Sequence, residues 1–110
     1  MAMTYKVLGQ IAATSNTTHN VYTVPAATEA VISSIVICNR NNNANCTYRI
    51  AVQPAGAALA NDHYIAYDAP VTALDSVALT LGVTMGNTDI LSVYSANANI
   101  TFSVFGSEIS

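Results

Sequence analysis

Hydrophobic and polar residues alternate with a period of two along most of the chain, which is the pattern of β-strands that bury one face. The clearest case is segment 76–84, in which Val77, Leu79, Leu81 and Val83 share one face and small or polar residues occupy the other. Similar runs predict about eight short strands in all. The other seven runs are residues 5–11, 21–24, 30–38, 46–53, 63–67, 90–94 and 100–105.

Segments rich in Asn, Thr, Ser, Gly and Pro separate these runs and predict turns. They cover residues 14–20, 25–28, 39–45, 54–61, 86–88 and 95–99. Only the Ala-rich residues 55–60 are expected to form a helical turn, which is too short to be stable alone. So many short strands in one chain of 110 residues predict an all-β, single-domain antiparallel β-sandwich over residues 1–110. Its topology is expected to be immunoglobulin-like or a jelly-roll.

Segment 31–38 departs from the alternation because both of its faces are apolar. One face carries Val31, Ile35 and Ile37, and the other carries Ile32, Val36 and Cys38. Something must cover the second face. The sequence allows two answers: a central strand under a long loop, or a neighbouring subunit.

Charged residues form only 8% of the chain, far below the usual fraction of about 25%. The chain has three basic residues, Lys6, Arg40 and Arg49, and six acidic ones. No basic stripe is therefore available for nucleic-acid phosphates. We also expect no membrane association, since no segment has the length of an apolar span or of a signal-peptide core. The protein is therefore expected to be made in a cytoplasm and to stay soluble.

Cys38 and Cys46 flank an Asn-rich loop, and this spacing predicts that they face each other across the base of a hairpin. A disulfide is then geometrically feasible. Two buried free thiols are the expected alternative in a cytoplasmic protein. Two cysteines alone do not resemble a zinc site, which needs four ligands in paired spacing.

His63 lies beside Asp62 and five residues before Asp68, which raises the question of a His-carboxylate pair. In a strand, His63 and Asp62 would point to opposite faces, so the carboxylate could not orient the imidazole. The remaining acids are isolated, no serine lies in a nucleophile elbow, and no phosphate-binding or calcium-binding loop is present. We therefore expect no enzymatic activity, no catalytic residues, no cofactor and no metal.

Six tyrosines and no tryptophan are present, and two interpretations apply to them. The tyrosines could form a platform on which sugar rings stack, or they could lie at the rim of the core with the hydroxyl group exposed to solvent. The six are Tyr5, Tyr22, Tyr48, Tyr64, Tyr67 and Tyr94.

Five strings extend over nearly the whole chain: VYTVPA at 21–26, ISSIVICNR at 32–40, YRIAV at 48–52, HYIAYD at 63–68 and FSVFGSEI at 102–109. In these strings the chain resembles small virion structural proteins encoded by tailed bacteriophages. The resemblance implies a non-enzymatic virion component that is made in the host cytoplasm and released by lysis. It brings no catalytic residues.

Within that class we expect a capsid decoration, or cement, subunit, because a compact sandwich without a long arm suits a knob added to a lattice. The alternatives are an accessory protein of the neck, tail, baseplate or fibre, and a receptor-binding or glycan-binding module. The expected partners are the major capsid protein or tail and neck proteins.

The apolar strand also predicts a homo-oligomer, because soluble monomers rarely expose large apolar patches. For a decoration protein we expect a trimer, matching the threefold positions of a capsid lattice. The predicted interface involves strand 31–38 and aromatic neighbours. Its candidate residues are Tyr22, Ile32, Val36 and Tyr48.

Overall fold

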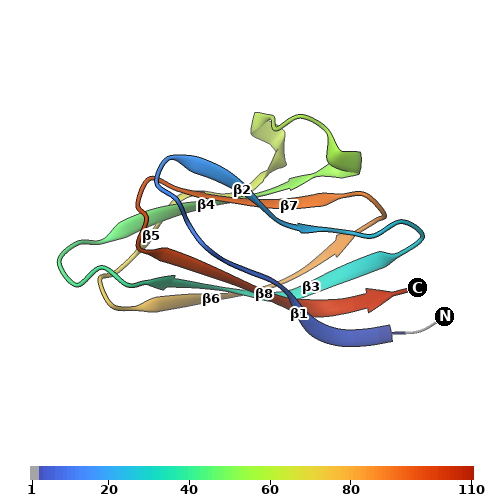
Figure 1. The fold of residues 1–110 in the computed structure, drawn as a ribbon, viewed down its shortest axis with the longest axis horizontal. Coiled ribbons are helices and arrows are strands. Elements are labelled where there is room, and N and C mark those ends of the chain that lie inside the picture. Colours follow the sequence, from blue (N-terminus) through green and yellow to red (C-terminus); the bar gives the residue numbers. More distant parts are fainter. Residues whose placement is uncertain (1–2) are drawn as a thin grey trace.

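Within residues 3–110, which are the residues that the computed structural model describes, eight β-strands form two antiparallel sheets packed face to face (Figure 1). Two short 3₁₀ turns, η1 (Pro54–Gly56) and η2 (Asn61–His63), lie in the connection between β4 and β5. The strands are β1 (Met3–Ala12), β2 (Thr17–Thr23), β3 (Glu29–Asn39), β4 (Cys46–Gln53), β5 (Tyr64–Val71), β6 (Ser76–Met85), β7 (Ile90–Ser95) and β8 (Ile100–Ile109).

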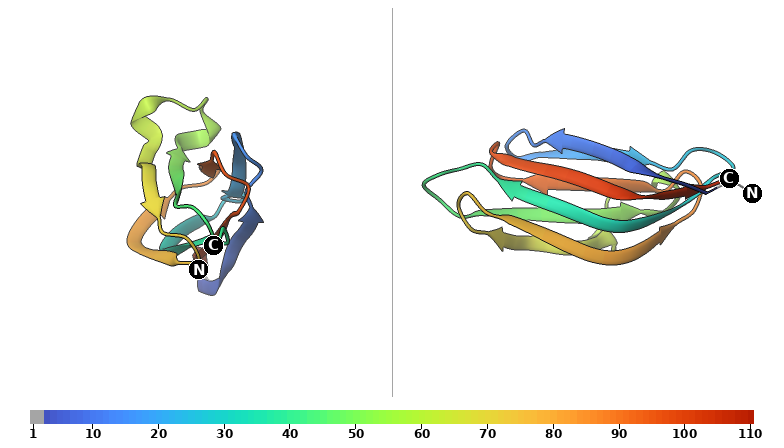
Figure 2. Two further views of the ribbon diagram at one scale, coloured as in Figure 1. Left: turned by 90° about the vertical axis from the view of Figure 1, so that its left-hand side faces the viewer. Right: turned by 90° about the horizontal axis from the view of Figure 1, so that it is seen from below.

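The strand order identifies the topology as a jelly-roll. The first sheet has the order β1-β8-β3-β6, and the second has the order β2-β7-β4-β5. Its antiparallel pairs β1–β8, β2–β7, β3–β6 and β4–β5 are those of one long hairpin folded over into two sheets. Figure 2 (right) shows the first sheet in blue, red, teal and orange, in that order. The predicted β-sandwich is confirmed, and of its two expected topologies the jelly-roll is the one observed.

The two inner faces enclose one hydrophobic core. Ile35, Ile37, Ile50 and Phe102 are fully buried in it, and the Phe102 ring meets Tyr48 edge to face with centroids 6.4 Å apart. Burial of each such side chain stabilises the fold by roughly 1.5–3 kcal/mol. These residues are the apolar members of the alternating runs.

The strand β3 contains a bulge at Ser33. Ile32 is opposite Gly106 of β8, whereas Ser34 is opposite Phe105, so Ser33 is an extra residue without a partner on β8. A bulge shifts the side-chain alternation by one position. Residues on either side of Ser33 therefore do not follow one continuous alternation.

The bulge corrects the predicted division of segment 31–38 into two apolar faces. Ile32, which the alternation placed opposite Ile35 and Ile37, points into the core with them, and all three are fully buried. Val36 and Cys38 lie on the outer face and are only partly exposed. The second apolar face is thus smaller than predicted.

All eight predicted strands are present, but their ends differ. Strand β2 begins at Thr17 rather than at residue 21, because its polar first half pairs with β7 through backbone hydrogen bonds. In β6, Val77, Leu79 and Val83 pack against the core as the alternation predicted, while the side chain of Leu81 lies outside the described part.

Candidate functional site

A stacked cluster around Arg49 lies on the outer face of the second sheet. The Arg49 guanidinium carbon is 4.1 Å from the ring centroid of Tyr67 and 4.7 Å from that of Tyr94. Nε and Nη2 of Arg49 donate hydrogen bonds of 2.7 and 3.2 Å to the two carboxylate oxygens of Asp68. Cation–π contacts and a bidentate ion pair together fix the orientation of a planar guanidinium. Three neighbouring strands, β5, β4 and β7, are thereby connected through their side chains.

A bulge in β5 makes this cluster possible. Tyr48 of β4 is opposite Ala69, whereas Ile50 is opposite Ala66, so Tyr67 and Asp68 together face the single residue Arg49. Asp68 has φ 51°, in the left-handed region that Asp tolerates better than most residues. In a regular strand two successive side chains would point to opposite faces. Here both reach Arg49.

The Arg49–Asp68 pair stays ionised over a wide pH range. The hydrogen bonds from Arg49 hold the pKa of the Asp68 carboxyl below its ordinary value, and the carboxylate in turn raises the pKa of Arg49. The two charges neutralise each other at the surface. This cluster therefore presents aromatic rings and no unpaired charge.

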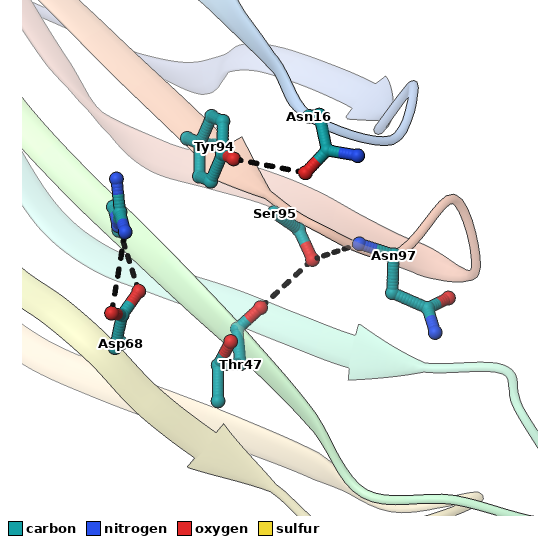
Figure 3. A network of polar contacts seen from close by, with 7 residues as sticks. Asn16, Thr47, Asp68, Tyr94, Ser95 and Asn97 are labelled. Atoms are coloured by element: carbon teal, nitrogen blue, oxygen red, sulfur yellow. Dashed lines mark hydrogen bonds and ion pairs between the residues drawn. The ribbon is translucent and has the colours of Figure 1, made fainter.

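Polar contacts continue from this cluster toward the loops at the end of β7 (Figure 3). The Tyr94 hydroxyl donates to Oδ1 of Asn16 at 3.1 Å, which connects β7 to the turn before β2. The buried Ser95 hydroxyl donates to the carbonyl of Thr47 at 2.8 Å and accepts from the backbone N–H of Asn97 at 3.0 Å. Tyr94 is therefore held by a hydrogen bond as well as by Arg49.

A hollow of about 460 Å³ opens beside the cluster and is lined by Asn61, Tyr64 and Tyr67. The rings of Tyr64 and Tyr67 stand almost perpendicular, at 84°, with centroids 4.9 Å apart. Asn61 belongs to η2, and both tyrosines belong to β5. The hollow thus has two aromatic walls and one amide.

The long β4–β5 connection folds back over the same outer face (Figure 1). Beneath it, Ala51 and Ser92 are buried although they point away from the core. Leu59 of the connection lies next to these two residues. Gln53 secures the connection, since its side-chain N–H donates to the Ala57 carbonyl at 2.8 Å and its oxygen accepts from the Ser92 hydroxyl. The backbone that carries Asn61 is therefore docked on the sheet.

Of the three residues considered for a His-carboxylate pair, His63 and Asp62 lie close together, contrary to the expectation that they point to opposite faces, and Asp68 is engaged elsewhere. Residues Asn61–His63 form a 3₁₀ turn rather than the start of a strand, and His63 Nδ1 accepts a hydrogen bond of 3.1 Å from the Ala60 backbone N–H. His63 Nε2 is 3.8 Å from Asp62, whose side chain is 86% exposed, while Asp68 is paired with Arg49. Among residues 3–110 no three His, Cys, Asp or Glu side chains gather as metal ligands would.

The outer face of the first sheet is apolar at the end where β1 begins and β8 ends. Met3, Tyr5 and Val7 on β1 are 54%, 80% and 49% exposed. Their outer-face neighbours include the partly exposed Phe105 and Ile109 of β8, opposite Val7 and Met3. We call these five residues, with Val31 of β3, the β1 patch.

The rest of that face is more polar. The Gln10 amide donates to Ser103 at 3.2 Å, and Arg40 donates to the Thr101 hydroxyl at 2.9 Å. The large, strongly exposed apolar side chains of this face therefore lie in the β1 patch, whereas Val36 and Cys38 of β3 are only partly exposed.

One cluster closes the edge between the two sheets near the β1 patch. Lys6 of β1 lies 2.8 Å from Glu108 of β8, and the Tyr22 hydroxyl of β2 donates to the same carboxylate at 2.5 Å. Hydrogen bonds from Lys6 first, and then from Tyr22, lower the pKa of Glu108. Burial, followed by the contact with Glu108, raises the pKa of Tyr22 above its ordinary value of 10.0. This cluster joins the sheets and is a structural feature.

The structure corrects three of the four predicted interface residues. Tyr22, Ile32 and Tyr48 are 8%, 0% and 3% exposed and point into the core, so they cannot be anchors on the surface of this fold. Val36 lies on the outer face of the first sheet and is partly exposed. A role for Val36 in an interface stays a prediction.

The predicted approach of Cys38 and Cys46 was wrong. The two strands that carry them, β3 and β4, belong to different sheets, so the Asn-rich loop crosses the sandwich instead of closing a hairpin. Cys38 points outward, Cys46 is buried in the core, and both are free thiols. The buried Asn39 amide stabilises the crossing by donating to the carbonyls of Ala44 and Val71 at 3.1 and 3.0 Å.

Two groups of surface residues escaped the sequence reasoning. The sequence analysis treated Arg49 only as a charge, and Tyr67-Asp68 fits a regular alternating strand, so the sequence gives no signal for the bulge that turns both side chains toward Arg49. Tyr5 and Val7 alternate with Lys6 in the way that core residues of a strand do. The bulge at Leu8 changes the alternation, so that Tyr5 and Val7 point outward instead.

No protein-family model matches the chain, and no match is found among curated proteins. Within the part of the chain that the structure covers, no helix has the length and apolar character needed to cross a membrane.

Proposed function

We propose that this chain is a non-enzymatic structural subunit of a bacteriophage particle, and within the particle a capsid decoration subunit. The resemblance of its sequence strings supports the phage class. The jelly-roll is compatible with it, because this fold serves in capsid proteins, although lectins and cupins also use it. Fold alone does not choose among them.

The β1 patch is the observation that carries the subunit role. Three apolar side chains on one strand, each about half exposed or more, lie beside the partly exposed Phe105 and Ile109. Apolar side chains grouped in this way cost free energy in water, and a protein partner would remove that cost. The partner is the major capsid protein, a second copy in a trimer, or both.

Three of the six acids have structural contacts, which supports a non-enzymatic role. Asp68 pairs with Arg49, and Glu108 pairs with Lys6. Asp89 accepts hydrogen bonds from the backbone N–H groups of Ala55 and Gly86 at 2.7 and 2.9 Å, where it stabilises a turn. These three acids are used to hold the fold.

The alternative within the same class is an accessory subunit of the neck, tail, baseplate or fibre. The β1 patch would serve there equally well, because it defines how the subunit attaches and not where. Reconstruction of the intact particle by electron microscopy distinguishes the positions. Density for the jelly-roll on the capsid surface supports decoration, and density on the tail supports the alternative.

The attachment is tested with the double variant Tyr5→Ser/Val7→Ser and the control Leu74→Ser. Leu74 is 70% exposed in a turn outside the β1 patch, so its replacement removes exposed apolar surface at another place on the molecule. We expect the double variant to remain folded, to lose self-association in light scattering, and to be depleted from purified particles by roughly tenfold or more. Leu74→Ser should behave as the unmodified protein. Equal occupancy of all three proteins, or absence of the unmodified chain from particles, contradicts the proposal.

A further inference from the structure

We propose that the hollow formed by Asn61, Tyr64 and Tyr67 binds the ring of a neutral saccharide. This site lies on the outer face of the second sheet, away from the β1 patch, and it does not depend on the phage assignment. A subunit held through the first sheet would leave the second sheet free for this contact.

The size and shape of the hollow suit a sugar ring. Its volume of about 460 Å³ falls in the range of roughly 300–1,000 Å³ for small-molecule sites. The perpendicular rings of Tyr64 and Tyr67 allow the C–H face of a pyranose to stack on one ring while its rim meets the other. A sugar presents this combination of an apolar face and a polar rim.

The polar groups of the hollow match hydroxyls. The Asn61 amide offers both a donor and an acceptor, and each tyrosine hydroxyl can do either, which is what neighbouring sugar hydroxyls require. The loop that carries Asn61 is docked through Gln53 and Ala57. The amide therefore comes from a supported backbone.

The aromatic wall is held in place before any ligand arrives. Tyr67 stacks on Arg49, and Arg49 is fixed in turn by Asp68 and Tyr94. Side chains that are already ordered lose less entropy on binding, which favours affinity for a small ligand.

The charges favour a neutral ligand over an acidic one. The positive charge nearest to the hollow, Arg49, is neutralised by a bidentate contact with Asp68. The exposed carboxylate of Asp62 follows Asn61 directly and would repel a uronic or sialic acid. Neither a phosphate nor a carboxylate ligand finds a free cation in this hollow.

The test is a titration of the ¹⁵N-labelled 110-residue protein with cellobiose, maltose, lactose and diacetylchitobiose, followed by amide chemical shifts. We expect at least one of these sugars to give saturable shifts centred on residues 61–68. Tyr67→Ala should weaken that binding roughly tenfold, as expected for a lost aromatic contact. Tyr5→Ala, which removes an exposed tyrosine from the other sheet, should leave the affinity unchanged.

A second variant keeps the inference testable if Tyr67→Ala perturbs β5. Asn61→Ala changes only an exposed turn residue and should also weaken binding, with the spectrum otherwise preserved. The inference is overturned if none of the four sugars gives saturable shifts, or if Asn61→Ala and Tyr67→Ala both bind normally. It is also overturned if a proline-rich peptide, the other ligand of aromatic grooves, occupies residues 61–68 while the sugars do not.

Discussion

The outer faces of the two sheets differ in how firmly their exposed aromatic side chains are held. On the second sheet, Tyr67 and Tyr94 are both stacked on Arg49, and Tyr94 is also hydrogen bonded to Asn16. On the first sheet, the 80% exposed Tyr5 makes no side-chain hydrogen bond or ring contact within the described residues. On the second sheet the exposed tyrosines are held by neighbouring side chains, whereas on the first sheet the Tyr5 side chain is unrestrained in the part of the chain that the structure describes.

This difference separates two kinds of binding. A small ligand contributes few contacts, so it needs a wall whose side chains are already fixed. A protein partner brings many contacts and fixes the side chains itself, so an apolar stripe without internal restraints is sufficient. The β1 patch therefore fits a protein partner, and the tyrosine hollow fits a small ligand.

The largest expected effect tests which side chains of β3 belong to the outer face. Ile32→Asp places a carboxylate in the core without a partner and should cost more than roughly 3 kcal/mol, enough to prevent or nearly prevent folding. Val31→Asp, one residue earlier, should leave the monomer folded and reduce association through the β1 patch. Circular dichroism with urea titration measures the first effect, and light scattering measures the second.

The two variants form a matched pair, because they introduce the same charge at adjacent positions. The reverse outcome, with Val31→Asp unfolded and Ile32→Asp tolerated, would mean that the bulge at Ser33 is absent and the β1 patch wrongly composed.

Much of the fold could be predicted because the alternation of apolar and polar residues indicates which side chains of a strand face the core. All eight strands follow from it, and so do the core positions Ile35, Ile37 and Phe102. The inward orientation of Ile32 could not be predicted from the alternation, because it results from a bulge, and a bulge depends on the pairing of two strands that are distant in sequence. Gly106 was the available signal: a Cβ there would lie 2.1 Å from the Val31 carbonyl oxygen, so the bulge leaves space only for glycine.

The candidate sites were less predictable than the fold. The tyrosines could be named, but their grouping depends on which strands become neighbours. Tyr94 of β7 and Tyr67 of β5 both stack on Arg49 only because β4 lies between their strands. The pairing of Cys38 with Cys46 failed for the same reason. A loop of seven residues fits a hairpin and a crossing between sheets equally well, and the strand order decides between them.

A smaller effect is expected from Arg49→Lys on the second sheet. Lysine keeps the charge but loses the planar, bidentate group, so Tyr67 and Tyr94 should lose their common partner. We expect a folded protein with weaker near-ultraviolet circular dichroism from tyrosine, and a smaller change in unfolding free energy than for Ile32→Asp.

The matched control is Arg40→Lys, because Arg40 bonds to Thr101 and to the Ala98 carbonyl and touches no ring in the described structure. This variant should retain the tyrosine signal. An unchanged signal in Arg49→Lys would show that the face is ordered without Arg49, and the contrast between the two sheets would lose its basis.

The smallest expected effect is on the pH dependence of stability. It concerns the carboxylates of Glu108 and Asp68. Both have a folded-state pKa below the ordinary values of 4.5 and 3.8, so each stabilises the fold above those values and loses this contribution as the pH falls. Glu108 should contribute more, because its side chain is 16% exposed and that of Asp68 is 48% exposed. Glu108→Gln should therefore flatten the acid limb of the stability curve below about pH 4.5 more than Asp68→Asn does.

The same cluster contributes to the alkaline limb through Tyr22, which makes the assignment to Glu108 specific. The pKa of Tyr22 is raised by burial and then by Glu108, so its contribution is complete below pH 10.0 and decreases as the pH rises above that value. Tyr22→Phe should flatten the alkaline limb. Glu108→Gln should flatten it in part, since burial remains, whereas Asp68→Asn should leave it unchanged. Thermal unfolding measured from acidic to alkaline pH gives all three curves, and equal alkaline limbs for Glu108→Gln and the unmodified protein would show that Glu108 and Tyr22 do not act together.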